Sequence, residues 1–161
     1  MYNLGNAYTA GTGVQVDISK AISFYEAAIK AGDPDSKFTY GTWLYKGFHG
    51  VAVDKARSFQ LQLEAADAGH AYAMFNTGAA YMEGAVVTQD FQTAAIWFEK
   101  AADEGVIEAN LNLGNLHRSG MGVPRNLHKA VEIFARFADR HELSAQMVEQ
   151  VKEEIKAEEQ R

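Results

Sequence analysis

Apolar residues recur at spacings of three and four along most of the chain, and polar residues fill the positions between them. Two such stripes are those of Ala21, Phe24 and Ala28 and of Ala94, Trp97 and Ala101. This spacing places the apolar side chains on one face of a helix. Because glycines flank each stripe, the pattern predicts an all-α fold of short amphipathic helices joined by tight turns.

The same pattern returns four times, with a period of 36 or 37 residues. Glycines mark two series, Gly5, Gly41, Gly78 and Gly114, and Gly11, Gly47, Gly84 and Gly120. The third series is Asp17, Asp54, Asp90 and Asn126, and the fourth is Gly32, Gly69 and Gly105, with His141 in the fourth place. Series that agree this closely predict four stacked units over about 1–34, 35–70, 71–106 and 107–141.

Each unit is predicted to be a hairpin of two helices. A glycine inside the first helix costs about 1 kcal/mol relative to alanine. We therefore expect it to permit a close helix crossing that a Cβ would block, with the large residue one turn later filling the space beside it. The second glycine ends this helix by adopting positive φ. The Asp or Asn of the third series is expected to cap the second helix, and Asp33 to cap the next unit ahead of Pro34.

Residues 142–161 lie outside the four units. Leu143, Met147, Val151 and Ile155 recur every four residues among mostly acidic neighbours, which predicts one amphipathic helix. Stacked repeats need an end element with a polar outer face. We expect this helix to be that cap; an acidic helix that binds a partner is the alternative.

Composition removes several classes of function. The chain has 161 residues, no cysteine and a net charge of −6, which argues against disulfides, cysteine nucleophiles and nucleic-acid binding. No apolar run is long enough to span a membrane, and no signal peptide is evident. We expect a soluble, cytoplasmic or periplasmic protein, and the sequence does not decide between these compartments.

Motifs for chemistry are sparse. Neither Gly11-x-Gly13 nor Gly120-x-Gly122 continues into a dinucleotide-binding loop, and no phosphate-binding loop or zinc-protease motif is present. We expect no catalytic residue, no cofactor and no metal site. His117 occupies a packing position that holds Tyr or Leu in the other units, so we expect it to be a partly buried filler.

These residues carry a family resemblance. The series Leu4-Gly5, Tyr8, Gly11, Gly13-Val14, Asp17, Lys20-Ala21 and Phe24-Tyr25 is similar to the Sel1-like repeat, a relative of the tetratricopeptide repeat. The resemblance implies a right-handed α-α superhelix, or solenoid, that serves as a protein-interaction scaffold. The first unit starts at Met1, so the opening turn of its first helix is absent. We expect this to leave an apolar N-terminal face through which the chain self-associates.

In the related tetratricopeptide scaffold the first helices line a concave groove. If this carries over, the partner-binding residues are those one and four places after the mid-helix glycine: Asn6, Thr9, Thr42, Tyr45, Ala79, Met82, Asn115 and Arg118. A third series, Tyr2, Phe38, Phe75 and Leu111, is apolar in every unit, and packing between helices explains it as well as binding does.

The resulting prediction is a non-enzymatic adaptor that binds a protein or peptide partner. Two alternatives stay open. One is β-lactam binding or hydrolysis, as in some cysteine-rich relatives, although this chain lacks their cysteines and a Ser-x-x-Lys motif. The other is a structural segment of a longer solenoid.

Overall fold

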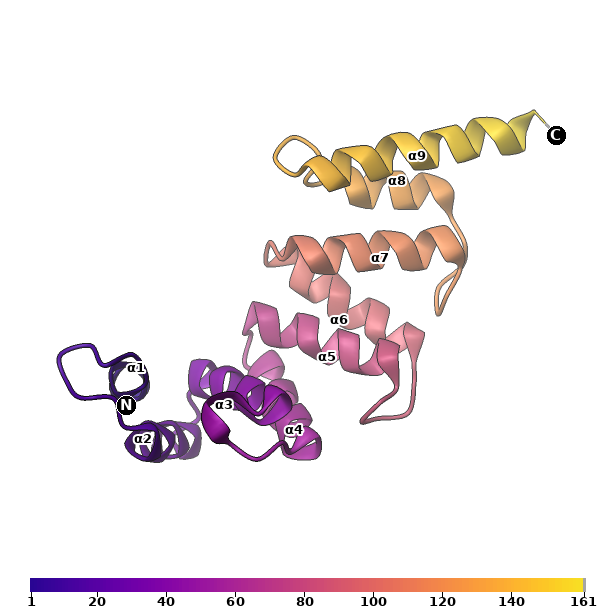
Figure 1. The fold of residues 1–161 in the computed structure, drawn as a ribbon. Helices are drawn as coiled ribbons and strands as arrows, with labels where there is room; N and C mark the ends of the chain where they lie inside the picture. Colours follow the sequence, from indigo (N-terminus) through magenta and orange to yellow (C-terminus); the bar gives the residue numbers. More distant parts are fainter. Residues whose placement is uncertain (161) are drawn as a thin grey trace. The chain divides into compact units, whose positions relative to one another are not determined.

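The computed structural model describes residues 1–160, and all its regular elements in this range are helical. They are α1 (Tyr2–Ala10), α2 (Ile18–Lys30), α3 (Pro34–Lys46), the short 3₁₀ turn η1 (Phe48–Gly50), α4 (Lys55–Asp67), α5 (Ala71–Glu83), α6 (Phe91–Asp103), α7 (Ile107–Ser119), α8 (Leu127–Ala135) and α9 (Glu142–Glu159) (Figure 1). The predicted all-α, solenoid-like repeat fold with a C-terminal helix is confirmed.

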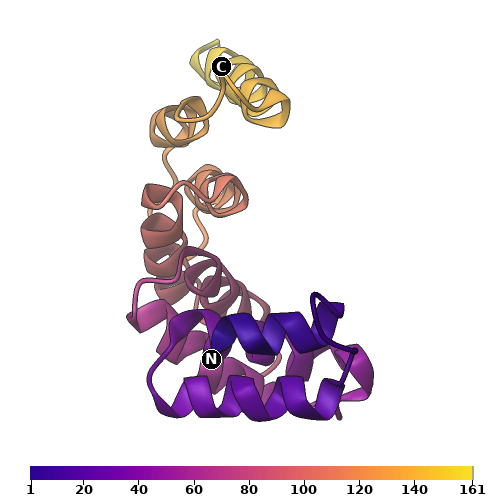
Figure 2. The same ribbon diagram turned by 90° about the vertical axis from the view of Figure 1, so that its left-hand side faces the viewer.

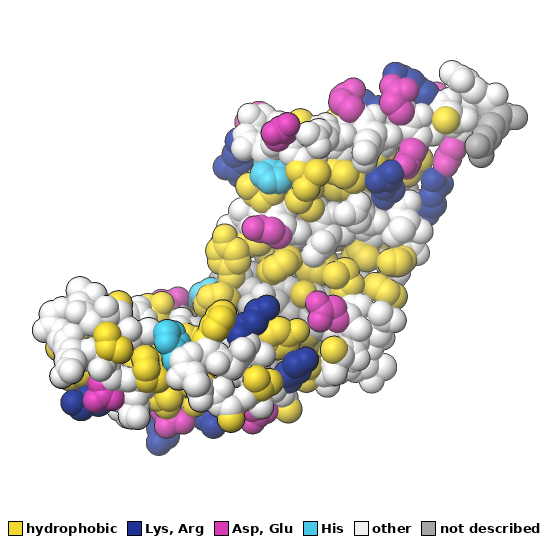
Figure 3. All heavy atoms as spheres, in the orientation of Figure 1, with side chains coloured by type: hydrophobic (Ala, Val, Ile, Leu, Met, Phe, Trp, Pro, Cys, Tyr) yellow, Lys and Arg dark blue, Asp and Glu magenta, His cyan; other side chains and the backbone are white. Residues whose placement is uncertain are grey.

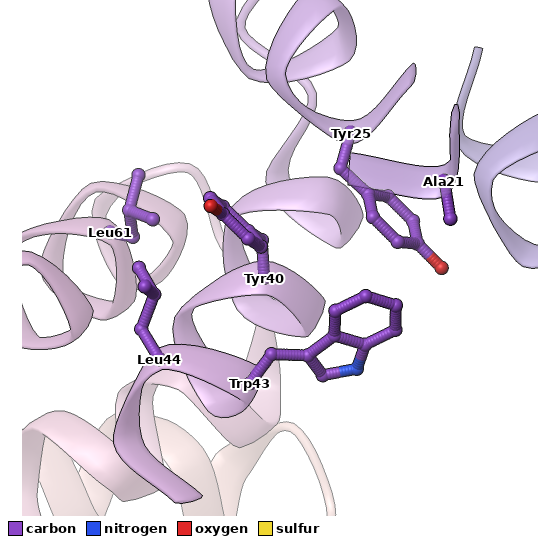
Figure 4. Close-up of a cluster of buried hydrophobic side chains, with 6 residues drawn as sticks. All are labelled: Ala21, Tyr25, Tyr40, Trp43, Leu44 and Leu61. Atoms are coloured by element: carbon purple, nitrogen blue, oxygen red, sulfur yellow. The ribbon is translucent and has the colours of Figure 1, made fainter. Parts of the chain in front are cut away.

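Contacts between helices divide the chain into two compact units, Met1–Thr77 and Gly78 onward, with the boundary inside α5. In the first unit α1 lies beside α2 (Figure 2), α2 packs on α3, and α3 packs on α4. The core comes from three of these helices (Figure 4) and consists of Ala21, Tyr25, Tyr40, Trp43, Leu44 and Leu61. The rings of Tyr25 and Trp43 meet edge to face with centroids 5.2 Å apart, which joins the first hairpin to the second.

In the second unit each helix from α6 to α9 packs on the next one along the chain. The cluster at its C-terminal end joins α8 to α9 and consists of Leu127, Ala130, Phe134, Val148 and Val151. Leu111 of α7 packs against the same cluster. The last helix is thus bound to the fourth repeat by apolar contacts, as expected of a cap.

The mid-helix glycines lie at close crossings, as predicted. A Cβ on Gly5 would lie 2.6 Å from Cε1 of Tyr25, and one on Gly78 would lie 2.9 Å from the Phe98 ring. The side chain over the glycine therefore comes from the second helix of the same repeat. In the second repeat this place is taken by a Gln62 amide, which lies 3.0 Å from the Cβ position of Gly41.

Caps and turns also follow the predictions. The side chains of Asp17, Asp54, Asp90 and Asn126 each accept a hydrogen bond from the first turn of the second helix, at 2.9–3.0 Å. Gly11, Gly47, Gly84 and Gly120 adopt φ of 73°, 71°, 70° and 77°, which ends each first helix. The one correction concerns His141. It does not take the place of a closing glycine but is the N-cap of α9, with Nδ1 accepting from the Ser144 amide at 3.3 Å.

Helix α9 repeats the pattern of the first helices. The mid-helix glycine is the eighth residue of α3, α5 and α7, and the third residue of each is small and fully buried: Ser36, Ala73 and Ala109. The third residue of α9 is Ser144, also fully buried, and its eighth is the exposed Glu149. The C-terminal helix α9 thus keeps the register of a first helix, with a glutamate in the place of the glycine.

Candidate functional site

The residues predicted to bind a partner are the ninth and twelfth of α3, α5 and α7, together with their equivalents Asn6 and Thr9 in the shorter α1. We call these the groove positions. The structure extends the series to α9, where Gln150 and Glu153 occupy the same two places.

In the first repeat the groove positions are engaged by the second helix. The buried Tyr25 hydroxyl donates to Oδ1 of Asn6 at 2.6 Å and lies 3.4 Å from Oγ1 of Thr9. The Thr9 hydroxyl also donates to the carbonyl of Gly5 at 2.9 Å. Burial raises the pKa of the Tyr25 phenol, so this hydroxyl stays protonated and keeps donating. Asn6 is thereby oriented, and its amide oxygen already accepts one hydrogen bond within the repeat.

In the second repeat the buried Gln62 plays the corresponding part. Its Nε2 lies 3.3 Å from Oγ1 of Thr42 and donates to the carbonyl of Phe38 at 3.1 Å. Its Oε1 accepts from Nδ2 of Asn76 on α5, at 3.3 Å. The side chain of Thr42 is therefore part of a polar network, whereas that of Tyr45 is 36% exposed.

The second unit contains the other four predicted residues. Ala79 and Met82 are half-buried, and Asn115 is exposed with its side chain directed to no hydrogen-bond partner among the described residues. Arg118 binds Glu154 of α9 through two hydrogen bonds, one from Nε to Oε2 at 3.1 Å and one from its terminal nitrogen to Oε1. This bond raises the pKa of the Arg118 guanidinium.

A hollow of about 880 Å³ lies along this pair. Its walls are Arg118 of α7 and the α9 residues Ala145, Gln146, Glu149, Gln150, Glu153 and Glu154. Charged side chains gather over α9 on the face shown in Figure 3. Three residues at groove positions, Arg118, Gln150 and Glu153, thus line one open hollow.

Sequence reasoning missed the contribution of α9 because its mid-helix glycine marker is absent. The signal that could have found it is Ser144, which stands in the series of small residues with Ser36, Ala73 and Ala109. A second glutamate, Glu158, accepts from Arg125 at 2.6 Å and holds the far part of α9 to the α7–α8 connection. The sequence showed these acids only as a polar outer face.

The apolar series of Tyr2, Phe38, Phe75 and Leu111 has packing contacts. Phe38 stacks on the ring of His70 with centroids 4.3 Å apart, and the Tyr2 hydroxyl lies 3.5 Å from Oγ1 of Thr39. Leu111 belongs to the α8–α9 cluster. The structure therefore assigns at least these three to contacts with neighbouring helices, within a repeat or between repeats.

Few groups in the structure are arranged for chemistry. Among residues 1–160 no three His, Asp or Glu side chains are grouped as metal ligands. Over the same range no helix combines the length and apolar character that a bilayer crossing requires. His117 is half-buried with a buried, unpaired Nδ1, as expected of a filler, and burial lowers the pKa of its imidazole, with the Lys129 charge adding to the effect.

Comparison with known proteins shows similarity to proteins built from repeats. The family model described as Sel1 repeat matches residues 1–33, 34–70, 71–106 and 107–141. Cytochrome c oxidase assembly factor 7A of Xenopus laevis is 28% identical over 93% of this chain and 68% of its own length. The ERAD-associated E3 ubiquitin-protein ligase component HRD3A of Arabidopsis thaliana is 31% identical over 71% of this chain, but only 18% of its own length.

Two known structures share the fold. The Sel1 repeat protein of Oxalobacter formigenes has a TM-score of 0.85 and 34% identity, covering 93% of this chain and 43% of its own. The protective antigen c5321 of uropathogenic Escherichia coli has a TM-score of 0.85 and 33% identity, covering 91% of this chain and 32% of its own. The chain thus spans less than half of either structure.

Proposed function

The chain belongs to the Sel1 repeat family, and we propose that it is a non-enzymatic scaffold that binds a protein or peptide partner along the first helices of its repeats. The observation that carries the proposal is the hollow beside Arg118, because residues at three groove positions line it together. One relative is named as an assembly factor and another as a component of a ligase. A scaffold that binds other proteins would suit either role.

The chemistry of the hollow suits recognition of a polypeptide. Amide groups such as those of Gln146 and Gln150 can both donate to and accept from a peptide backbone. Arg118 and Glu154 satisfy each other, so a partner can bind beside them without leaving either charge buried and unpaired. The half-exposed aromatic and arginine side chains at groove positions, Tyr45 and Arg118, are residue types that dominate the energy of interfaces.

The test is affinity capture from lysate of the source cells with three baits. They are the wild type, a groove variant with Tyr45→Ala and Asn115→Arg, and a control with Lys30→Ala and Ile96→Ala on exposed sides of second helices. Both groove substitutions alter side chains that make no hydrogen bond in the described fold. A partner held by the wild type and the control but lost by the groove variant supports the proposal. A partner held equally by all three contradicts it.

A second candidate is self-association through α1. Leu4 is 46% exposed, whereas the equivalent residues Tyr40, Thr77 and Leu113 of the other repeats are at most 5% exposed. The exposed Leu4 therefore offers an apolar contact on the surface of α1. Sedimentation of the wild type and of Leu4→Glu tests this: a concentration-dependent dimer that the substitution abolishes supports it, and a wild-type monomer at high concentration refutes it.

The hydrolase alternative is tested independently by a chromogenic β-lactam assay on the purified protein. Turnover above the buffer rate would replace the scaffold proposal. Its absence would leave partner capture as the deciding experiment.

A further inference from the structure

Two lysine side chains converge on the exposed ring of Tyr45. The Nζ atom of Lys46 lies 5.3 Å from the ring centroid, and that of Lys55 lies 5.4 Å from it. Each contact is favourable by itself, but two like charges gathered at one ring repel each other. Within residues 1–160 neither ammonium forms an ion pair, whereas Lys20 and Lys37 of the same unit do. The two ammonium groups therefore create a local positive potential that no ion pair neutralises among the described residues.

Exposed apolar side chains lie in the same stretch of chain as these lysines. Tyr45 is 36% exposed, and the connection that follows it exposes 49% of Phe48 and 58% of Val53. We call Tyr45, Lys46, Phe48, Val53 and Lys55 the Tyr45 patch. The corresponding connection of the fourth repeat exposes one large apolar side chain, Met121. Clustered apolar exposure beside charges is typical of a surface that meets another protein.

The backbone under the patch is anchored to α3 by a ring contact and a hydrogen bond. This connection is one residue longer than the others, and the added residue lies in the 3₁₀ turn Phe48–Gly50. His49 there adopts φ 56°, which is rare for a residue other than glycine, and its ring lies 4.3 Å from that of the buried Trp43. The Asp54 amide then donates to the carbonyl of Leu44 at 2.9 Å. A connection fixed in this way loses little entropy on binding.

We propose that the Tyr45 patch binds an acidic segment of the partner protein in which a carboxylate stands next to an apolar side chain. The carboxylate would lie at the two ammonium groups, and the apolar side chain would cover Phe48 and Val53. The inference rests on the proposed scaffold function and names the chemistry of the partner. Tyr45 links the Tyr45 patch to the proposed scaffold function, since it is both a groove position and the centre of the patch.

Charge complementarity favours an acidic polypeptide over a membrane surface. Anionic membranes are recognised by clusters of about four to eight Lys and Arg residues. The patch has two lysines, and residues 1–77 carry six Lys and Arg against seven Asp and Glu. Two lysines at one ring suit a single carboxylate better than an extended anionic surface.

The experiment uses arrays of short synthetic peptides in three sets that share the same Leu and Phe content. The sets differ in carrying Asp and Glu, Lys, or Gln at the remaining positions, and vesicles with and without phosphatidylserine form a further arm. The proteins are the wild type, Lys46→Glu with Lys55→Glu, and a control of equal charge change, Lys20→Glu with Lys30→Glu on α2. Circular dichroism verifies that all three are folded.

We expect the wild type and the control to prefer the acidic set, and the Lys46→Glu, Lys55→Glu variant to lose about tenfold or more in affinity for it. Amide shifts of the wild type with an acidic peptide should concentrate at residues 45–55. Equal binding of the three sets, no binding, or lysine-dependent binding of phosphatidylserine vesicles alone would overturn the inference. If the wild type shows no preference for acidic peptides but partner capture still depends on Asn115, the inference about the Tyr45 patch fails and the proposed scaffold function is retained.

Discussion

The ring of Phe134 in α8 lies directly on Gly114 of α7, and an added Cβ would overlap its Cε1 and Cζ atoms. The same relationship holds between Phe98 and Gly78. The aromatic residue of the second helix thus needs the glycine of the first. This pairing fixes how the two helices of a repeat cross, and it explains why the glycine recurs in the middle of a helix.

Replacing Gly114 by alanine should therefore destabilise the second unit. Alanine gains about 1 kcal/mol of helix propensity, but forcing an atom into a packed crossing costs about 1–3 kcal/mol, so we expect a net loss. Urea denaturation followed by circular dichroism measures it. The matched control is Glu149→Ala at the same place in α9. Glu149 is exposed and its pair with Lys152 lies on the surface, so stability should change little. Equal stability of Gly114→Ala and the wild type would refute the crossing model.

Capping by Asn126 can be separated from charge. Its side chain accepts from the Lys129 amide at 2.9 Å, so Asn126→Ala should lower the free energy of unfolding by about 1 kcal/mol. Asn126→Asp keeps the acceptor and reproduces the residue of the other three repeats, so it should leave stability close to that of the wild type. The same denaturation measurement decides. If the free energy of unfolding is lowered as much in the aspartate variant as in the alanine variant, Asn126 does not stabilise the helix through this hydrogen bond.

Stability should fall on mild acidification because of His117. Burial lowers the pKa of its imidazole below the ordinary value of 6.5, so the unfolded chain binds this proton first as the pH falls. The neutral imidazole contributes fully to the free energy of unfolding above pH 6.5. As the pH falls from 6.5 to the lowered pKa, this contribution is lost progressively. His117→Leu, which copies Leu44 of the second repeat, and His117→Gln should both flatten this part of a pH series of unfolding curves. An unchanged slope in both variants would contradict the assignment.

The ion pair between Arg118 and Glu154 should hold α9 on the fourth repeat. Since both side chains are about one third exposed, a double-mutant cycle should give a coupling of about 0.5–1 kcal/mol. Hydrogen exchange of α9 should be faster in Arg118→Gln and in Glu154→Gln, and no faster in the double variant than in either single one. Lys156→Gln, which breaks a pair within α9, is the control. Unchanged exchange in all variants would show that the apolar contacts and the pair of Arg125 with Glu158 hold the helix without this ion pair.

Much of the local structure could be predicted because it depends on neighbours in the sequence. A cap such as Asp17 acts three residues ahead, and a turn glycine such as Gly11 acts through its own φ. The close crossing at Gly78 was also predictable. A glycine in the middle of a helix lowers its stability, so some compensating contact was to be expected. These features repeat four times, so a pattern that arose by chance in one unit could be told apart because the other units would lack it.

Contacts between distant segments could not be predicted in the same way. The sequence contained no pattern that predicts the hydrogen bond from Tyr25 to Asn6, or the one from Arg118 to Glu154 of the tail. Such pairs depend on the crossing angle of two helices and on side-chain rotamers. The role of α9 was hidden for a related reason: Glu149 replaces the glycine marker, while the buried inner residues Ser144 and Val148 keep the register.

The central claim is that partners bind along the first helices. Site-specific photo-cross-linking tests it directly, with benzoylphenylalanine placed at Tyr45 or Asn115 in the groove positions and, as the control, at the half-exposed Ile96 of the second helix α6. Irradiation in lysate of the source cells should join a common partner to positions 45 and 115 and not to position 96. Cross-links from position 96 alone would place the binding surface on the second helices and contradict the account.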